Sequence, residues 1–252
     1  MLKIIAIGNS FSQDATYYLH RIAEADNVDI KTANLFIGGC SLQRHWYNIS
    51  NDIQDYYYEE NGKYTGKKVS VKQALSMDSW DYVVTQQASH DSGIAETYHP
   101  YIEQIAAYVK KVAPQAELLL HETWAYENDC LHDQFCRYEK NQQIMYDKLS
   151  QAYKSATEQL SVRLIPCGDV IQKLRAQEPF RYGHGGMSLC RDGFHMNLIY
   201  GRYLLSAVWY RFLTGNSVSS NTYVPHTDLA PNAVCDGKVL DIIKSTVDEM
   251  IY

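Results

Sequence analysis

The alternation of strand-like and helix-like runs constrains the fold of this chain more than any other feature. Runs rich in β-branched and aliphatic residues occur at positions 3–7, 30–36, 82–86, 117–121 and 163–166. Runs with apolar residues three and four positions apart predict helices at 16–25, 100–113, 138–160, 170–176, 198–213 and 238–251. Strand, helix and strand in succession favour parallel strands with right-handed crossovers. We therefore predict an α/β fold, a three-layer α/β/α sandwich around a five-stranded parallel sheet.

The chain has 252 residues, enough for one α/β domain with a substantial core, so we predict a single domain over residues 1–252. Two segments depart from the alternation. Residues 51–71 contain a run of tyrosines followed by Asn61-Gly62, a pair typical of a type I′ turn, which predicts a small β-hairpin inserted between the second and third strands. Residues 124–137 form a polar and aromatic loop after the fourth strand, where functional residues concentrate.

The formal net charge of −6 argues against nucleic-acid binding, because the sequence lacks the basic stripe that such binding needs. No lysine-rich run indicates a membrane surface, and no stretch of about 18 apolar residues predicts a transmembrane helix. The apolar run at residues 4–7 is too short for a signal peptide. We expect a cytoplasmic protein, unless an export signal has been removed.

The cysteine spacing does not favour a metal site. The six cysteines are scattered and form no Cys-x-x-Cys pair, so we expect no zinc site and predict reduced thiols. Cys130 and Cys136 share a loop, and their pairing stays open. The 21 tyrosines are best interpreted as amphipathic rings at the core boundary, with aromatic walls for a sugar-like ligand as the alternative.

Ser10 is the first candidate for chemistry. It lies in Gly8-Asn9-Ser10, where the first strand-like run ends, and this places it at the carboxyl edge of the predicted sheet. Ligands of open α/β sheets bind in the crevice at that edge. A serine there can act as a nucleophile if a base reaches its hydroxyl group.

Two other segments offer partners for Ser10. Asp192 and His195 lie on a loop entering a helix, where the carboxylate can reach one ring nitrogen and leave the other to take a proton from Ser10. An N-cap aspartate beside a surface histidine explains this spacing about as well. Gly38-Gly39 lets the backbone aim an N–H at a ligand, although an ordinary strand-to-helix turn also favours glycine.

Together these segments resemble the SGNH (GDSL-like) hydrolases over roughly residues 1 to 215. Gly8 to Ser12 is similar to the first sequence block of that superfamily, usually Gly-Asp-Ser-x-Ser, and 192–195 to its Asp-x-x-His block. Residues 34–41 are similar to the second block, whose oxyanion glycine falls on Gly39. The Gly-Asn-Ser-Phe-Ser and Gln-Gln motifs resemble the DUF4886 subgroup most closely. The resemblance implies a flavodoxin-like sheet and the catalytic residues Ser10, Asp192 and His195.

The third block departs from the superfamily, which usually has Gly-x-Asn-Asp with an asparagine that donates to the oxyanion. This chain has Gln86-Gln87-Ala88-Ser89, without an asparagine. We predict that Gln87 substitutes as an oxyanion donor beside the backbone N–H groups of Ser10 and Gly39. Additional substrate-binding candidates at the same edge are Gln86, Ser89, His121 and Trp124. The pair His90 and Asp91 is an alternative base for Ser10.

We therefore expect a serine esterase acting on a small acyl ester, above all an acetyl ester, whose alcohol is a small molecule or a carbohydrate. No metal or organic cofactor is expected. One alternative is a carbohydrate-binding protein that kept the scaffold without catalysis, and another is an acyltransferase. The sequence leaves open the acyl group, the alcohol and the oligomeric state.

Overall fold

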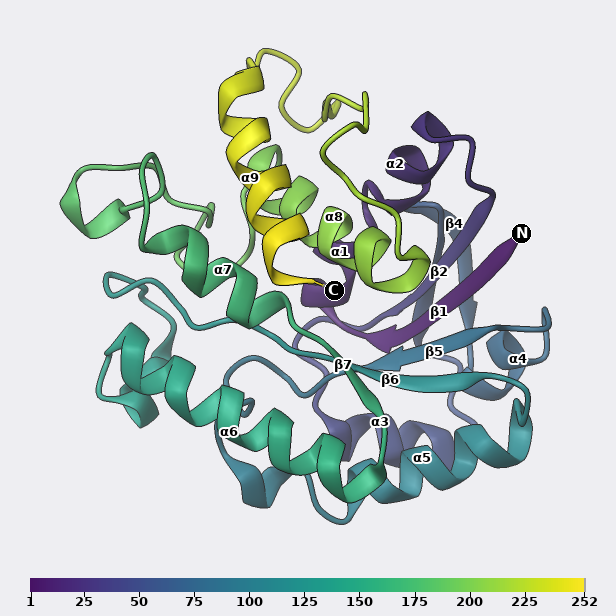
Figure 1. Cartoon of the computed structure of the whole chain (residues 1–252). Coiled ribbons are helices and arrows are strands. Elements are labelled where there is room, and N and C mark those ends of the chain that lie inside the picture. The colour runs from purple at the N-terminus through teal and green to yellow at the C-terminus, as the bar shows by residue number, and fades with distance from the viewer. Residues whose placement is uncertain (252) are drawn as a thin grey trace.

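A seven-stranded sheet forms the centre of the computed structural model, which describes residues 1–251 (Figure 1). Its order is β4-β3-β2-β1-β5-β6-β7. The strands are β1 (Leu2–Gly8), β2 (Ile30–Phe36), β3 (Tyr56–Glu60), β4 (Lys63–Val69), β5 (Tyr82–Thr85), β6 (Glu117–His121) and β7 (Arg163–Ile165). All pairings among β2, β1, β5, β6 and β7 are parallel. The predicted α/β class and parallel core are confirmed.

The sheet has more strands than predicted, because the inserted hairpin joins it instead of standing apart. β3 pairs antiparallel with β2 and with β4, and so extends the edge of the sheet. Asn61 and Gly62 form the turn with φ values of 50° and 76°. Positive φ at both central residues is what a type I′ turn requires, so the Asn-Gly signal predicted the local structure correctly.

Helices cover both faces of the sheet, which explains why Ile4 to Ile7 in β1 are all buried (Figure 1). One face carries α1 (Ser10–Thr16), α2 (Leu19–Ala25), α7 (Cys167–Arg175), α8 (Tyr200–Thr214) and α9 (Gly237–Met250). The other carries α3 (Leu42–Ser50), α4 (Val71–Leu75), α5 (Tyr101–Val112) and α6 (Gln142–Leu160). The helix predicted at 16–25 is α2, which begins at Leu19, and the short helix α1 before it was not predicted. α1 begins at Ser10, where Asn9 and Ser12 form a capping box.

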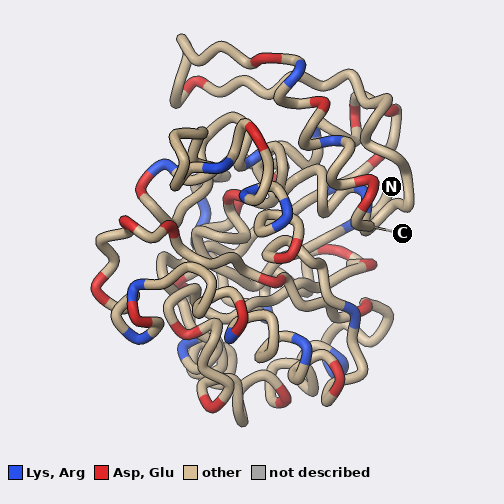
Figure 2. Tube along the Cα trace, turned by 60° about the vertical axis from the view of Figure 1, so that its left-hand side comes forward, with Lys and Arg blue, Asp and Glu red and all other residues tan. Residues whose placement is uncertain are grey.

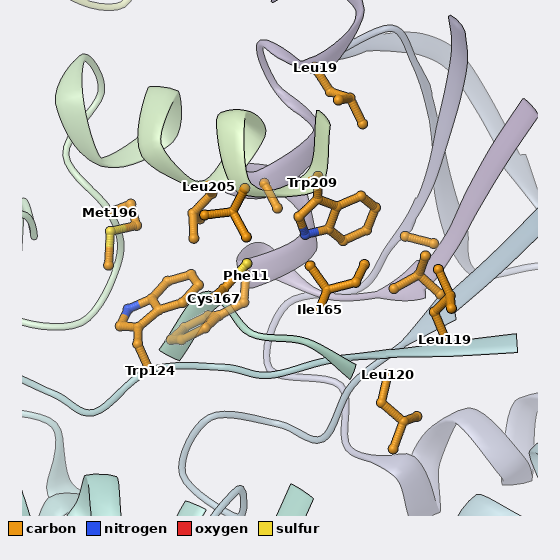
Figure 3. Close-up of a cluster of buried hydrophobic side chains, with 14 of the residues drawn as sticks. Phe11, Leu19, Leu119, Leu120, Trp124, Ile165, Cys167, Met196, Leu205 and Trp209 are labelled. Atoms are coloured by element: carbon orange, nitrogen blue, oxygen red, sulfur yellow. The ribbon is translucent and has the colours of Figure 1, made fainter. Parts of the chain in front are cut away.

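Many of the aromatic and aliphatic side chains in Figure 3 pack between α8 and the sheet, and the cluster reaches the carboxyl ends of the strands at Phe11 and Trp124. Phe11 of α1 stacks on Trp124, which follows β6, with the ring centroids 4.0 Å apart. Met196 and Trp209 also belong to this buried core. The core therefore joins α1, the segment after β6 and the segment before α8, and these are the parts of the chain that carry the candidate site.

Charged residues of both signs are interspersed along the chain (Figure 2). Several form ion pairs at the surface, such as Arg163 with Glu117 and Lys68 with Asp55. The six cysteines, Cys130 and Cys136 among them, are free thiols. Among the helices within residues 1–251, none combines the length and the apolar character that a membrane span requires.

Candidate functional site

Ser10, His195 and Asp192 form a continuous chain of hydrogen bonds at the carboxyl edge of the sheet. The distance from Ser10 Oγ to His195 Nε2 is 2.9 Å, and that from His195 Nδ1 to Asp192 Oδ2 is 2.7 Å. With the ring proton on Nδ1 facing Asp192, Nε2 is free to accept the Ser10 proton. In this arrangement a serine hydroxyl can lose its proton while it attacks an electrophile.

The loop that carries His195 is shaped by Asp192. Asp192 Oδ1 accepts the backbone N–H groups of Phe194 at 3.2 Å and of His195 at 2.7 Å. Gly193 between them has a φ of 87°, which favours glycine. Partial burial acts to raise the pKa of Asp192, but hydrogen bonds from the His195 ring and from these backbone groups outweigh it and lower the pKa. The carboxylate is therefore held ionised beside the ring that it orients.

Asp14 connects the loop that carries His195 to α1, the helix that begins with Ser10. It is fully buried, and its carboxylate accepts the Met196 backbone N–H at 3.0 Å. It also accepts Arg202 Nε at 2.7 Å and Arg191 Nη1 at 3.0 Å. Because Asp14 lies one turn after Ser10 and Met196 directly follows His195, one carboxylate sets the spacing of both segments.

Trp124 was predicted to bind substrate, but the structure places it beneath the site. Its side chain is fully buried against Phe11, and Nε1 donates to the Phe194 carbonyl at 2.7 Å. The ring centroids of Phe194 and His195 are 4.1 Å apart. Trp124 therefore supports the His195 loop from below and has no surface to offer a ligand.

His121 is a second correction. It is fully buried and packs edge-on against Trp209 at 5.3 Å, and burial lowers its pKa to about 3. The neutral ring belongs to the core and does not reach the site. The neighbouring Glu122 is also buried, which raises its pKa to about 8, and it accepts the Asp169 backbone N–H at 2.9 Å in the first turn of α7.

Gln87 does not take the predicted place of an oxyanion donor. Its amide oxygen accepts the Leu42 backbone N–H at 2.9 Å and the Ala88 backbone N–H at 2.8 Å. Its amide nitrogen donates to the carbonyl and hydroxyl oxygens of Thr97, both at 3.0 Å. Both halves of the amide are thus used to join α3 to the loop after β5. This placement corrects the prediction.

The other two candidates of the third block also make internal contacts. Gln86 is buried and donates from Nε2 to Asn9 Oδ1 at 3.2 Å, so it lies beneath the turn that carries Ser10. Ser89 shares a hydrogen bond with the Tyr126 hydroxyl at 2.7 Å and is largely buried. Neither contact supports the predicted substrate-binding role.

Gly39 lies in the turn between β2 and α3, and its role as an oxyanion donor stays a prediction. It is exposed with a φ of 59°, and a Cβ added there would meet nothing within 4 Å. Ser10 is the first residue of α1, where the peptide N–H has no partner inside the helix. Asn9 joins the two turns, because its Nδ2 donates to the Cys40 carbonyl at 3.1 Å. The Gly39 turn therefore lies next to the Ser10 turn at the carboxyl edge of the sheet.

His132 is a residue of the site region that sequence reasoning missed. Its ring contacts Phe194 edge-on at 5.1 Å and stacks on His90 at 5.7 Å. Its Nδ1 accepts the Gln134 backbone N–H at 3.2 Å, which leaves the proton on Nε2. His90, the alternative base, lies against this ring and within 3.5 Å of Asp91, while the only hydrogen-bond partner of Ser10 Oγ within residues 1–251 is His195.

A hollow of about 410 Å³ lies beside the Asp192 loop. Its lining includes the carboxylates of Asp129 and Asp192, the guanidinium of Arg191, the exposed side chain of Leu131 and the ring of Tyr182. The Tyr182 hydroxyl donates to Asp129 at 2.7 Å and so joins the two loops that border the hollow. Ser10, His195 and Gly39 are not among the residues that line it.

Comparisons with solved structures agree with this architecture. A DUF4886 family protein from Bacteroides uniformis is 33% identical, with a TM-score of 0.88 over 99% of this chain and 94% of that one. A protein from Slackia heliotrinireducens that is proposed to be an SGNH hydrolase is 21% identical, with a TM-score of 0.56 over 84% and 98% of the two chains. A catalytic mutant of an acetylxylan esterase from Geobacillus stearothermophilus is 13% identical, with a TM-score of 0.53 over 83% and 93%. The last two structures show that this chain shares their fold.

The comparison with curated proteins gave no match. The family model for a domain of unknown function, DUF4886, matches residues 3–235. The motifs, the parallel sheet and this match agree: the chain belongs to the DUF4886 family and has the fold of the SGNH hydrolases.

Proposed function

We propose that this protein is a serine esterase that hydrolyses small acyl esters, with Ser10 as nucleophile, His195 as base and Asp192 as the residue that orients His195. The observation that carries the proposal is the hydrogen-bond chain from Asp192 through His195 to Ser10, at 2.7 and 2.9 Å. A surface serine has no structural need for such partners, whereas a nucleophile needs both.

The reaction follows from these contacts. As Ser10 Oγ forms a bond to the acyl carbon, its proton passes to His195 Nε2, and Asp192 stabilises the resulting imidazolium. His195 then gives the proton to the alcohol oxygen as the carbon–oxygen bond of the ester breaks. Water, deprotonated by His195, attacks the acyl group on Ser10, and the acid leaves as the serine hydroxyl is restored.

The backbone N–H groups of Ser10 and Gly39 hold the oxyanion in this proposal, without a contribution from Gln87. Removal of one donor from an oxyanion hole lowers kcat by roughly 10²–10³-fold in well-studied enzymes. A site with two backbone donors is therefore expected to turn over its substrate more slowly than a site with three donors.

The lining of the hollow beside Asp192 and the likeness of fold both support one class of substrate. In this proposal the alcohol extends from Ser10 past His195 to the hollow beside Asp192, where the oxygen atoms of Asp129 and the ring of Tyr182 suit a hydroxylated group such as a sugar. The likeness of fold to an acetylxylan esterase supports a carbohydrate alcohol by analogy. We therefore propose an acetyl ester of a carbohydrate as the substrate.

Hydrolysis of p-nitrophenyl acetate, butyrate and octanoate by the native protein and by Ser10→Ala tests this proposal. We expect turnover of the acetate at least about 10-fold faster than of the octanoate, and loss of turnover in Ser10→Ala to the rate of the uncatalysed reaction. Equal rates for the two proteins would rule out the esterase. Saturable binding of acetylated xylo-oligosaccharides without turnover would favour the carbohydrate-binding alternative instead.

A further inference from the structure

We propose that Asn9 is a positioning residue that holds the Gly39 turn against the Ser10 turn, and that aspartate cannot replace it in this chain. The inference rests on the proposed function, since it concerns the two backbone donors of that site. Asn9 is the N-cap of α1 and only 1% exposed. Its side chain contacts three segments that are far apart in the sequence.

The contacts fix the orientation of the Asn9 amide. Oδ1 accepts the Phe11 backbone N–H at 3.0 Å and the Gln86 amide at 3.2 Å. A backbone N–H can only donate, so the amide oxygen must face Phe11 and the amide nitrogen must face the other way. That nitrogen donates to the Cys40 carbonyl at 3.1 Å.

The Cys40 contact holds the segment that directly follows Gly39. Gly39 directly precedes Cys40 and has the left-handed conformation, with a φ of 59°. Beyond the β1–β2 ladder, which ends at the pair Gly8 and Phe36, the Ile37 N–H contacts the Gly8 carbonyl only at the long distance of 3.5 Å. The hydrogen bond from Asn9 is the shorter of these two contacts, and in this proposal it holds the Gly39 turn next to the Ser10 turn.

An aspartate at position 9 can keep the contacts with Phe11 and Gln86, but it cannot donate to the Cys40 carbonyl. A carboxylate still accepts from Phe11 and Gln86, but it places an oxygen where the amide nitrogen faces the Cys40 carbonyl. Two buried acceptors about 3 Å apart repel each other, so the turn that carries Gly39 must move away. The usual Gly-Asp-Ser form of the superfamily is thus incompatible with this arrangement of Asn9, Cys40 and Gln86.

Asn221 supplies a matched control. It too is 1% exposed, its Oδ1 accepts the backbone N–H two residues later, from Tyr223 at 3.0 Å, and its Nδ2 donates to the Ile22 carbonyl at 2.8 Å. It lies in the segment between α8 and α9, away from the site. Asn221→Asp therefore makes the same chemical change to the same kind of contact elsewhere.

Steady-state kinetics with p-nitrophenyl acetate tests the proposal, with each variant measured well below its own Tm. We expect Asn9→Asp to lower kcat by about 10–100-fold while KM stays within about 3-fold, because the oxyanion donors act on the transition state. Asn221→Asp should keep the native kcat. Asn9→Ser, which can still cap α1 but cannot reach Cys40, should follow Asn9→Asp. An unchanged kcat in Asn9→Asp, or an equal loss in Asn221→Asp, would overturn the inference.

Hydrogen exchange gives a readout that does not depend on turnover. Amide exchange in a peptide covering residues 36–42 should be faster in Asn9→Asp and Asn9→Ser than in the native protein, and unchanged in Asn221→Asp. A native protein without esterase activity would refute the proposed function, and the exchange measurement would still decide the role of Asn9. Unchanged exchange at residues 36–42 in both Asn9 variants would refute the positioning role alone.

Discussion

Replacing His195 with alanine is expected to lower kcat for p-nitrophenyl acetate by roughly 10⁴-fold or more. His195 Nε2, at 2.9 Å, is the only hydrogen-bond partner of Ser10 Oγ within residues 1–251, so its removal leaves the nucleophile without a base. The ring is only partly buried, so the variant should fold with little change in Tm. Stopped-flow and steady-state rates on the purified variant provide the measurement.

Two further variants test the role of Asp192 and the alternative base His90. In Asp192→Asn, the amide oxygen can still accept the N–H groups of Phe194 and His195, but the amide nitrogen then faces His195 Nδ1. This forces the ring proton onto Nε2, so we expect a loss of about 10⁴-fold with the loop intact. His90→Ala should keep kcat within several-fold of the native value. If His90→Ala lost as much activity as His195→Ala, the assignment of the base would be wrong.

Asp14→Asn is expected to lower the free energy of unfolding by about 3–5 kcal/mol, because it leaves the buried Arg202 guanidinium without its carboxylate. Activity should fall as well, by about 10²-fold, since the link from α1 to the Met196 backbone sets the distance between Ser10 and His195. Urea unfolding at pH 7 and kcat below the Tm of the variant measure the two effects.

Glu122→Gln is the matched control, since it also replaces a fully buried carboxyl group with an amide. Burial raises the pKa of Glu122 to about 8, so the group is mostly neutral at pH 7, and glutamine can still accept the Asp169 N–H. We expect native activity and a change in unfolding free energy below about 1 kcal/mol. A similarly small effect of Asp14→Asn on both stability and kcat would show that Asp14 does not connect the two segments.

The strands were predictable because a sheet covered on both faces leaves a simple pattern of apolar residues. The bounds of β2 and β6 match the predicted runs 30–36 and 117–121, and the hairpin follows from Asn61-Gly62. The start of α1 was missed because its first turn, Ser10 to Gln13, is mostly polar. The capping pair Asn9 and Ser12 was a signal for that start, and it carried more information than the apolar periodicity.

The geometry of the site was predictable only where the residues in contact are close together in the sequence. Asp192 and His195 are three residues apart, so their contact follows from a local turn. The places of Trp124 and Gln87 depend on partners such as Phe194 and Leu42, which lie 70 and 45 positions away in the sequence. Position at the end of a strand indicates the edge of the sheet, but it does not say whether a side chain faces the solvent or the core.

Reaction with a fluorophosphonate, followed by intact-protein and peptide mass spectrometry, tests the central claim most directly. Fluorophosphonates form a stable bond with serines that are activated by a base, and leave ordinary surface serines unmodified. We predict one adduct per chain, on the peptide that contains Ser10, with none in Ser10→Ala and far slower labelling in His195→Ala. An adduct on another serine, or a native protein that stays unlabelled, would contradict the account of Ser10 as an activated nucleophile.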